Sequence, residues 1–389
     1  MSNVSNAQDQ WNELMWPNYG TPKVALARGN GAHVWDLDGK EYLDFVAGIA
    51  VNILGHANPA IINAVTTQMG ILGHTANIAI HEPGLNLARK LVDLVGGDAK
   101  VFFCNSGAEV NESAIKLSRF SGKTEIIALK MSFHGRTVGG TAMTGQPKKY
   151  EPFLPLLDDV KFVEANNVEE LKAAITDKTA ALWIEPVQGE GGVLPMTQEF
   201  MTAARELCTQ HDAMLVLDEV QTGIARTGQM FAYENYGIKP DVLLLAKGLG
   251  GGFPIGACIA FGKYQSLMAA GLHGSTFGGN APACAASLAV LKEVEDQNLV
   301  KRALEIGQAF RELEGTPHVK LVRGLGAMIG VVLDKEIGVE VEAAARAKGL
   351  LINNINPTVL RIVPPLIIND EEVAEAIRIL KEAIGEAGA

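Results

Sequence analysis

Residues 242–252 read VLLLAKGLGGG, a stretch in which an apolar run ends at Lys247 and a glycine-rich segment follows. A lysine at the end of a buried strand is unusual, because burying an unpaired ammonium group is costly. A Schiff base removes this cost, since the amine becomes part of a covalent imine. The stretch therefore predicts a strand that carries a reactive lysine to a ligand site.

Other short apolar runs precede this stretch, and they alternate with segments of helical periodicity. The predicted strands are Val101–Cys104, Glu125–Leu129, Ala180–Ile184, Met214–Leu217 and Val242–Ala246. The predicted helices between them are Glu109–Phe120, Val168–Ile175 and Gln198–His211. Such alternation indicates an α/β fold with a mainly parallel sheet that is covered on both faces.

The two ends of the chain have a different pattern. Residues 34–45 predict a hairpin that turns at Asp38-Gly39. Beyond about residue 286 we expect a long helix over Ser287–Leu313 and then strands over Val319–Leu333. A helix over Val339–Lys348, further strands through Val363 and a final helix from Asp370 follow. A chain of 389 residues favours two domains. We expect a large domain over residues 51–285 and a smaller α+β domain formed by residues 1–50 and 286–389.

Composition excludes several classes of protein. The net charge of −11 argues against binding to nucleic acid, which requires clustered cations. The four cysteines are widely spaced and indicate a reducing, cytoplasmic location. Residues 1–22 contain no Lys or Arg and no apolar core of a secretory signal, and no run of about 18 apolar residues predicts a membrane span.

In open α/β sheets, ligands bind at the carboxyl ends of the strands. The first run is followed by Ser106, Gly107 and Ala108, where a tight turn into a helix could bind a phosphate or serve only as a connection. The second is followed by Phe133 and Arg136, an aromatic ring and a cation, although a loop phenylalanine is more often part of the core.

The third such position is Asp218, which follows Met214–Leu217. In an extended chain Asp218 and Val220 point the same way, so one ligand ring could meet both, although Asp218 could also be a simple helix cap. A phosphate seat, a ring, a carboxylate and Lys247 together match the needs of pyridoxal 5'-phosphate (PLP). Motifs that bind nucleoside triphosphates, dinucleotides or zinc are absent, as is the nucleophile motif of serine hydrolases. The scattered histidines predict no metal site.

A series of motifs resembles the class III (ω-amino-group) aminotransferases over nearly the whole chain. The matching stretches are WDLDGKEYLDFVAGIAVNILGH (35–56), FFCNSGAEVNE (102–112), SFHGRT (132–137), EPVQGEGG (185–192), LDEVQTGIARTG (217–228), AKGLGGGFPIGA (246–257), HGSTFGGN (273–280) and LRIVPPL (360–366). This resemblance implies the fold of the aspartate-aminotransferase superfamily and a homodimer whose active sites lie at the subunit interface.

The resemblance also implies roles for individual residues. It assigns the cofactor phosphate to Gly107 and Ala108, stacking to Phe133, the pyridine ring to Asp218 and Gln221, and the Schiff base to Lys247. It places Thr276 at the phosphate of the neighbouring subunit. Ala108 departs from the family pattern, because many relatives have a threonine there.

For the substrate, the resemblance points to Arg136, Ser275 and Arg361, with Glu190 as the ion-pair partner of Arg361 between half-reactions. A surface ion pair is the alternative interpretation of Arg361 and Glu190. The implied reaction moves the terminal amine of N2-acetylornithine to 2-oxoglutarate, a step of arginine biosynthesis. Succinylornithine, ornithine or N-succinyl-diaminopimelate as donor stays open, as does a PLP aminomutase or decarboxylase. A non-catalytic PLP-binding regulator is disfavoured, because no basic helix-turn-helix stretch is present.

Overall fold

The computed structural model describes residues 2–389, and its largest sheet has seven strands. Their order is β4 (Ala99–Cys104), β12 (Gly256–Phe261), β11 (Val242–Leu245), β10 (Met214–Asp218), β7 (Thr179–Ile184), β5 (Glu125–Leu129) and β6 (Val160–Val163). Only β12 runs antiparallel to its neighbours, β4 and β11. The predicted α/β fold with a mainly parallel sheet is confirmed, and all five predicted strands belong to this sheet.

Both faces of the seven-stranded sheet are buried, as the uninterrupted apolar runs predict. Alternate residues along β7 and β10 point to opposite faces. Trp183 and Val216 pack with helix α5 (Gly107–Ser118) on one face. Leu182 and Leu215 belong to the core on the other face, which includes residues of α4 (Glu82–Leu94), α9 (Gln198–Gln210) and α10 (Ala281–Asp296).

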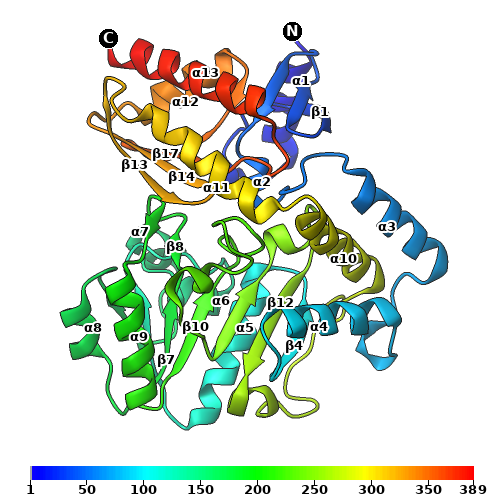
Figure 1. Ribbon diagram of the computed structural model, residues 1–389, viewed down its shortest axis with the longest axis vertical. Helices are drawn as coiled ribbons and strands as arrows, with labels where there is room; N and C mark the ends of the chain where they lie inside the picture. The colour runs from blue at the N-terminus through cyan, green and yellow to red at the C-terminus, as the bar shows by residue number, and fades with distance from the viewer. Residues whose placement is uncertain (1) are drawn as a thin grey trace.

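The two ends of the chain meet on one side of this sheet, at the top of Figure 1. The predicted hairpin at Asp38-Gly39 is present, and the C-terminal strand β15 pairs in parallel with it, with Leu350 opposite Leu43. This sheet comprises β1 (Leu26–Asn30), β2 (His33–Asp36), β3 (Glu41–Asp44) and β15 (Leu350–Leu351). A third sheet comprises β13 (Val319–Leu325), β14 (Met328–Leu333), β17 (Val359–Ile362) and β16 (Asn353–Asn356). A short hairpin of β8 (Val187–Gln188) and β9 (Leu194–Pro195) connects β7 to α9. The predicted domain boundaries stay a prediction.

One predicted helix is wrong. Residues 287–313 do not form a single helix: α10 ends at Asp296, and α11 (Leu299–Ala309) begins after Asn298, followed by a 3-10 turn to Leu313. Asn298 has a φ of 51°, a left-handed conformation that asparagine adopts more readily than most residues. The apolar pattern continues through this break, so periodicity alone does not show it.

The remaining helices include the predicted C-terminal pair. They are α1 (Asn3–Leu14), α2 (Ala47–Ala50), α3 (Pro59–Ile71), α6 (Val138–Met143), α7 (Pro147–Tyr150), α8 (Val168–Ala174), α12 (Gly338–Ala347) and α13 (Asp370–Gly388). Helix α13 begins with a capping box, in which Asn369 and Glu372 each accept a hydrogen bond from the other's backbone N–H. None of the helices within residues 2–389 combines the length and apolar character that crossing a membrane requires.

Candidate active site

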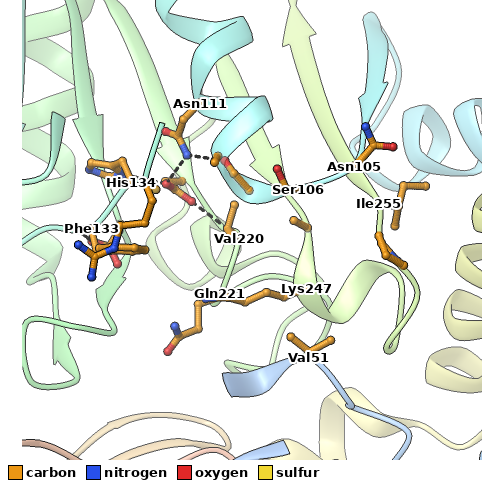
Figure 2. Close-up of a pocket in the computed structure, with 18 of the residues that line it drawn as sticks. Val51, Asn105, Ser106, Asn111, Phe133, His134, Val220, Gln221, Lys247 and Ile255 are labelled. Atoms are coloured by element: carbon orange, nitrogen blue, oxygen red, sulfur yellow. Dashed lines mark hydrogen bonds and ion pairs between the residues drawn. The ribbon is translucent and has the colours of Figure 1, made fainter. Parts of the chain in front are cut away.

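A cavity of about 470 Å³ opens at the carboxyl ends of the parallel strands, where the fold rule places ligands. It brings together ten of the predicted site residues: Ser106, Gly107, Ala108, Phe133, Arg136, Glu190, Asp218, Val220, Gln221 and Lys247. In the view of Figure 2, Phe133 and His134 lie on one side, Asn105 on the other, and Lys247 between them. These residues come from segments far apart in the sequence and meet because β4, β5, β10 and β11 end at the same edge of the sheet.

Lys247 lies two residues beyond the end of β11 and has a positive φ of 41°. This left-handed conformation is strained for a residue with a side chain, and such strain is concentrated at functional sites. Burial, together with the positive charge of Arg361, lowers the pKa of Lys247 to about 8. Its Nζ forms no hydrogen bond or ion pair with any residue that the structure describes. An amine of this kind is suited to nucleophilic attack on a carbonyl group.

Asp218, at the end of β10, is held by donors from three segments. Its Oδ2 accepts hydrogen bonds from His134 Nδ1 at 2.7 Å and from Asn111 Nδ2 at 3.0 Å, while Oδ1 accepts from the backbone N–H of Val220 at 3.1 Å. The amide of Asn111 is itself held, because its Oδ1 accepts from Trp183 Nε1 at 2.9 Å. These contacts keep the carboxylate in one orientation.

The environment of His134 follows from this contact. Burial opposes protonation of the ring, but the hydrogen bond and charge of Asp218 outweigh burial and raise the pKa of His134. Its Nε2 is buried and has no partner among residues 2–389. The hydrogen bond between Asp218 and the buried ring of His134 fixes the orientation of both side chains.

The first turn of α5 is shaped for close approach. Ser106 caps the helix by accepting from the backbone N–H of Glu109 at 3.2 Å. A Cβ atom on Gly107 would lie 2.7 Å from Val220 Cγ1, so only glycine fits there. Gly135 has a φ of 117°, and a Cβ on it would lie 2.9 Å from the Cβ of Ala108. The free N–H groups of this turn and the helix dipole favour an anion.

Phe133 is positioned by the buried side chain of Glu185. Glu185 Oε1 accepts from the N–H of Phe133 at 2.8 Å, and Oε2 accepts from the N–H of Gly189 at 3.3 Å. Burial raises the pKa of Glu185 to about 7, an effect that the nearby His134 partly opposes. The ring of Phe133 also faces two cations, with Lys149 Nζ 4.8 Å and Arg136 Cζ 5.3 Å from its centre.

Arg361, on β17, does not line the cavity but forms hydrogen bonds with residues that do. It is 2% exposed. Its Nη1 donates to Glu190 Oε1 at 2.8 Å and to Gln221 Oε1 at 3.5 Å, while Nη2 donates to Asn353 at 2.6 Å. Burial alone would raise the pKa of Glu190, but Arg361 and then Lys149 lower it. The alternative of a surface ion pair is wrong, since the guanidinium is buried.

Besides Arg361, two further predicted residues do not line this cavity. Ser275 and Thr276 line a neighbouring cavity of about 330 Å³, which shares Asn105 with the first. Asn105 Nδ2 donates to Ser275 Oγ at 3.0 Å. Within one chain, Thr276 therefore does not line the cavity that contains Lys247.

Sequence reasoning overlooked three residues of the site, and their signals differ. Glu185 directly follows the apolar run Ala180–Ile184, so the strand-end rule that singled out Asp218 would have found it. His134 lies within a quoted motif without a role of its own. Asn111 also lies within a family motif (102–112), but its contact with Asp218 has no local signal, because the two residues are 107 positions apart.

The residues present fit PLP. An unpartnered lysine amine, a carboxylate backed by His134 and a helix start with free N–H groups line one cavity, and these are the groups that the aldehyde, the pyridine nitrogen and the phosphate need. The fold and this site define a PLP-dependent enzyme.

The comparisons with known proteins agree. The family described as "Aminotransferase class-III" matches residues 15–384. Acetylornithine aminotransferase of Mycolicibacterium smegmatis is 50% identical, with 98% of each chain covered. The structure of ornithine aminotransferase from Toxoplasma gondii, with partial PLP occupancy, superimposes with a TM-score of 0.95 at 30% identity, covering 100% of this chain and 95% of that one. N-acetylornithine aminotransferase of Stenotrophomonas maltophilia gives 0.83 at 39% identity, covering 95% and 98%.

The chain belongs to the class III aminotransferases, and PLP is its cofactor. It catalyses transamination between a small-molecule amino donor and an acceptor.

Proposed function

We propose that this enzyme transfers the terminal amino group of N2-acetylornithine to 2-oxoglutarate, giving N-acetylglutamate semialdehyde and glutamate in arginine biosynthesis. The observation that carries the proposal is the buried Arg361, whose guanidinium is paired with Glu190 at the edge of the cavity. A donor with one carboxylate leaves this pair intact, whereas a dicarboxylate acceptor can replace Glu190 on Arg361. The names of the M. smegmatis and S. maltophilia relatives support the same substrate.

In this proposal each part of PLP is held by residues that line the cavity. Lys247 would bind the aldehyde, and Ser106, Gly107 and Ala108 would bind the phosphate, with Thr276 of a second subunit as a further contact. Phe133 would stack on the ring, Val220 and Gln221 would contact it, and Asp218 would hold the proton of the pyridine nitrogen. When bound, PLP supplies an electron sink for the carbon that carries the transferred amine.

The chain itself moves the proton. The amine of Lys247 would take up and return the proton at the substrate carbon that carries the transferred amine. The lowered pKa of Lys247 supports this role, since a fraction of such an amine is neutral near neutral pH. Asp218 keeps its position because His134 and Asn111 both donate to it.

Two arginines divide the recognition of carboxylates. Arg136 is exposed at the mouth of the cavity and binds the carboxylate that both substrates have, with Ser275 as a further contact. Arg361 binds the second carboxylate of 2-oxoglutarate. The planar guanidinium group of arginine suits both tasks, because it can bind a carboxylate with two parallel hydrogen bonds.

We also propose a cytoplasmic homodimer. The placement of Ser275 and Thr276 outside the Lys247 cavity of their own chain supports a site completed by a second copy. Exposed apolar side chains at and after the end of α3 support a buried interface there, with Ile71, Ile78 and Ile80 exposed by 74%, 94% and 85%. The four cysteines are free and buried, which supports a reducing compartment.

The substrate is tested by steady-state kinetics with 2-oxoglutarate and four donors: N2-acetylornithine, N2-succinylornithine, ornithine and N-succinyl-diaminopimelate. We expect the highest kcat/KM with N2-acetylornithine. A higher kcat/KM for any of the other three would assign the enzyme to that donor instead.

A further inference from the structure

Lys149, on the short helix α7, contacts the site but has no role in the scheme above. Its Nζ lies 3.3 Å from Glu190 Oε2, and the other oxygen of the same carboxylate is bonded to Arg361. The side chain is 21% exposed, so this is a largely buried ion pair. Glu190 is therefore shared between two cations, one of which is proposed to bind substrate.

The position of Lys149 is fixed by its surroundings. The ammonium group also lies 4.8 Å from the centre of the Phe133 ring, on which a cation is stabilised. Helix α7 is tied to the segment before Phe133, because Gln146 Nε2 donates to the carbonyl oxygens of Met131 and Ser132 and the N–H of Lys149 donates to Gln146. Lys149 thus stays near Glu190 without the help of Arg361.

The separation of Glu190 from Arg361 has a cost that depends on Lys149. The Glu190 side chain is 29% exposed, and a largely buried carboxylate that loses its only cation is unfavourable. With Lys149 present, Glu190 keeps one charged hydrogen bond after it leaves Arg361. Binding of a single carboxylate at Arg136 requires no such separation.

We propose that Lys149 is a specificity-determining residue: it holds Glu190 when a dicarboxylate takes Arg361, and so favours binding of the acceptor over the donor. The inference rests on the proposed function only in the role of Arg361 as the site of the second carboxylate. Lys149 acts through Glu190 and is a positioning residue.

Equilibrium binding to the PLP-loaded protein tests this without turnover. Glutarate is a dicarboxylate with the carbon chain length of 2-oxoglutarate, and pentanoate is the matching monocarboxylate. In Lys149→Met we expect the Kd of glutarate to rise about five- to tenfold, as for loss of a partly buried ion pair, and that of pentanoate to change less than about twofold. Lys149→Arg should restore glutarate binding. Lys148→Met is the matched control, because Lys148 is exposed on the same helix and forms no ion pair with any described residue.

A double-mutant cycle separates this role from a direct contact. In a Glu190→Gln background, Lys149→Met should have no further effect on glutarate, because the carboxylate that Lys149 holds is gone. An unchanged loss in that background, an equal loss for pentanoate, or no loss in Lys149→Met would each overturn the proposal. None of these binding measurements uses the proposed donor. Failure of N2-acetylornithine as a substrate would therefore leave the glutarate and pentanoate results unchanged, and the two failures can be told apart.

In the kinetics, the KM for 2-oxoglutarate should rise in Lys149→Met by the same factor as the Kd of glutarate, with the rate at saturation unchanged. A fall in the saturated rate with an unchanged KM would contradict the inference.

Discussion

At the scale of single residues, Asp218 is surrounded by hydrogen-bond donors. In Asp218→Asn the new NH2 group would face either the donors of both His134 and Asn111 or the N–H of Val220, and the negative charge would be lost. We expect kcat to fall by about two to three orders of magnitude, the range for removing a preorganised electrostatic group. The pKa of His134 should fall too, because Asp218 raises it.

Stopped assays give kcat, and NMR titration of the histidine ring gives the pKa. Turnover within a few-fold of the parent enzyme would show that the carboxylate is not needed. An unchanged His134 pKa would show that Asp218 is not what raises it.

Glu190, also at the scale of single residues, should affect the rates of the two half-reactions differently. In Glu190→Gln, Arg361 loses its charged partner whenever the monocarboxylate donor occupies the site. The donor half-reaction should therefore slow more than the 2-oxoglutarate half-reaction, by about tenfold, the scale of one lost charged hydrogen bond. Single-turnover rates of each half-reaction measure this, and equal losses in both would mean that Glu190 is only structural.

At the scale of elements, Glu219 connects the end of β10 to a short 3-10 helix, Ala232–Tyr236. Its carboxylate accepts from the N–H groups of Ala232 and Tyr233, and the side chain is 1% exposed. Burial raises the pKa of Glu219 to about 8 from its ordinary value of 4.5, although these two donors oppose the effect. The folded protein thus binds a proton that the unfolded chain releases at lower pH.

The stability that comes from this proton is complete below about pH 4.5 and is lost as the pH rises to about 8. Within that window, the free energy of unfolding should fall by up to about 1.4 kcal/mol per pH unit because of this group. Glu219→Gln lacks the titrating group and should lose stability less steeply. Urea unfolding of both PLP-loaded proteins at pH 5.5 and pH 8 gives the two differences, and an identical change in both would contradict the prediction.

At the scale of the whole molecule, the proposed dimer would place Thr276 in the active site of its partner. Thr276→Ala should weaken PLP binding by about tenfold or more, the effect of one lost hydrogen bond to a charged group. Mixed dimers of one Thr276→Ala subunit and one Lys247→Ala subunit provide the test. In one of their two sites, the intact Lys247 of the first subunit is combined with the intact Thr276 of the second.

PLP retention during dialysis should therefore recover at one site per mixed dimer. If retention in the mixture equals the average of the two parent variants, Thr276 acts within its own chain and the shared site is wrong. Protein concentration is held constant, because it controls dimer formation.

The sequence by itself determined much of the fold and part of the site. All five strands predicted from the apolar runs are present, because strands buried on both faces need uninterrupted apolar residues. The strand-end rule then placed Asp218 and Lys247 in one cavity. Local patterning did not reveal the break at Asn298, since a left-handed residue interrupts a helix without interrupting its apolar periodicity.

Only the tertiary structure decided which side chains touch. His134 and Asp218 are 84 positions apart, and Glu190 and Arg361 are 171 positions apart. Their contacts depend on the strand order β4-β12-β11-β10-β7-β5-β6 and on how the third sheet packs above its edge. That order results from packing two apolar faces at once, a long-range property that no local pattern contains, whereas strand and helix periodicities are local and can be read directly from the chain.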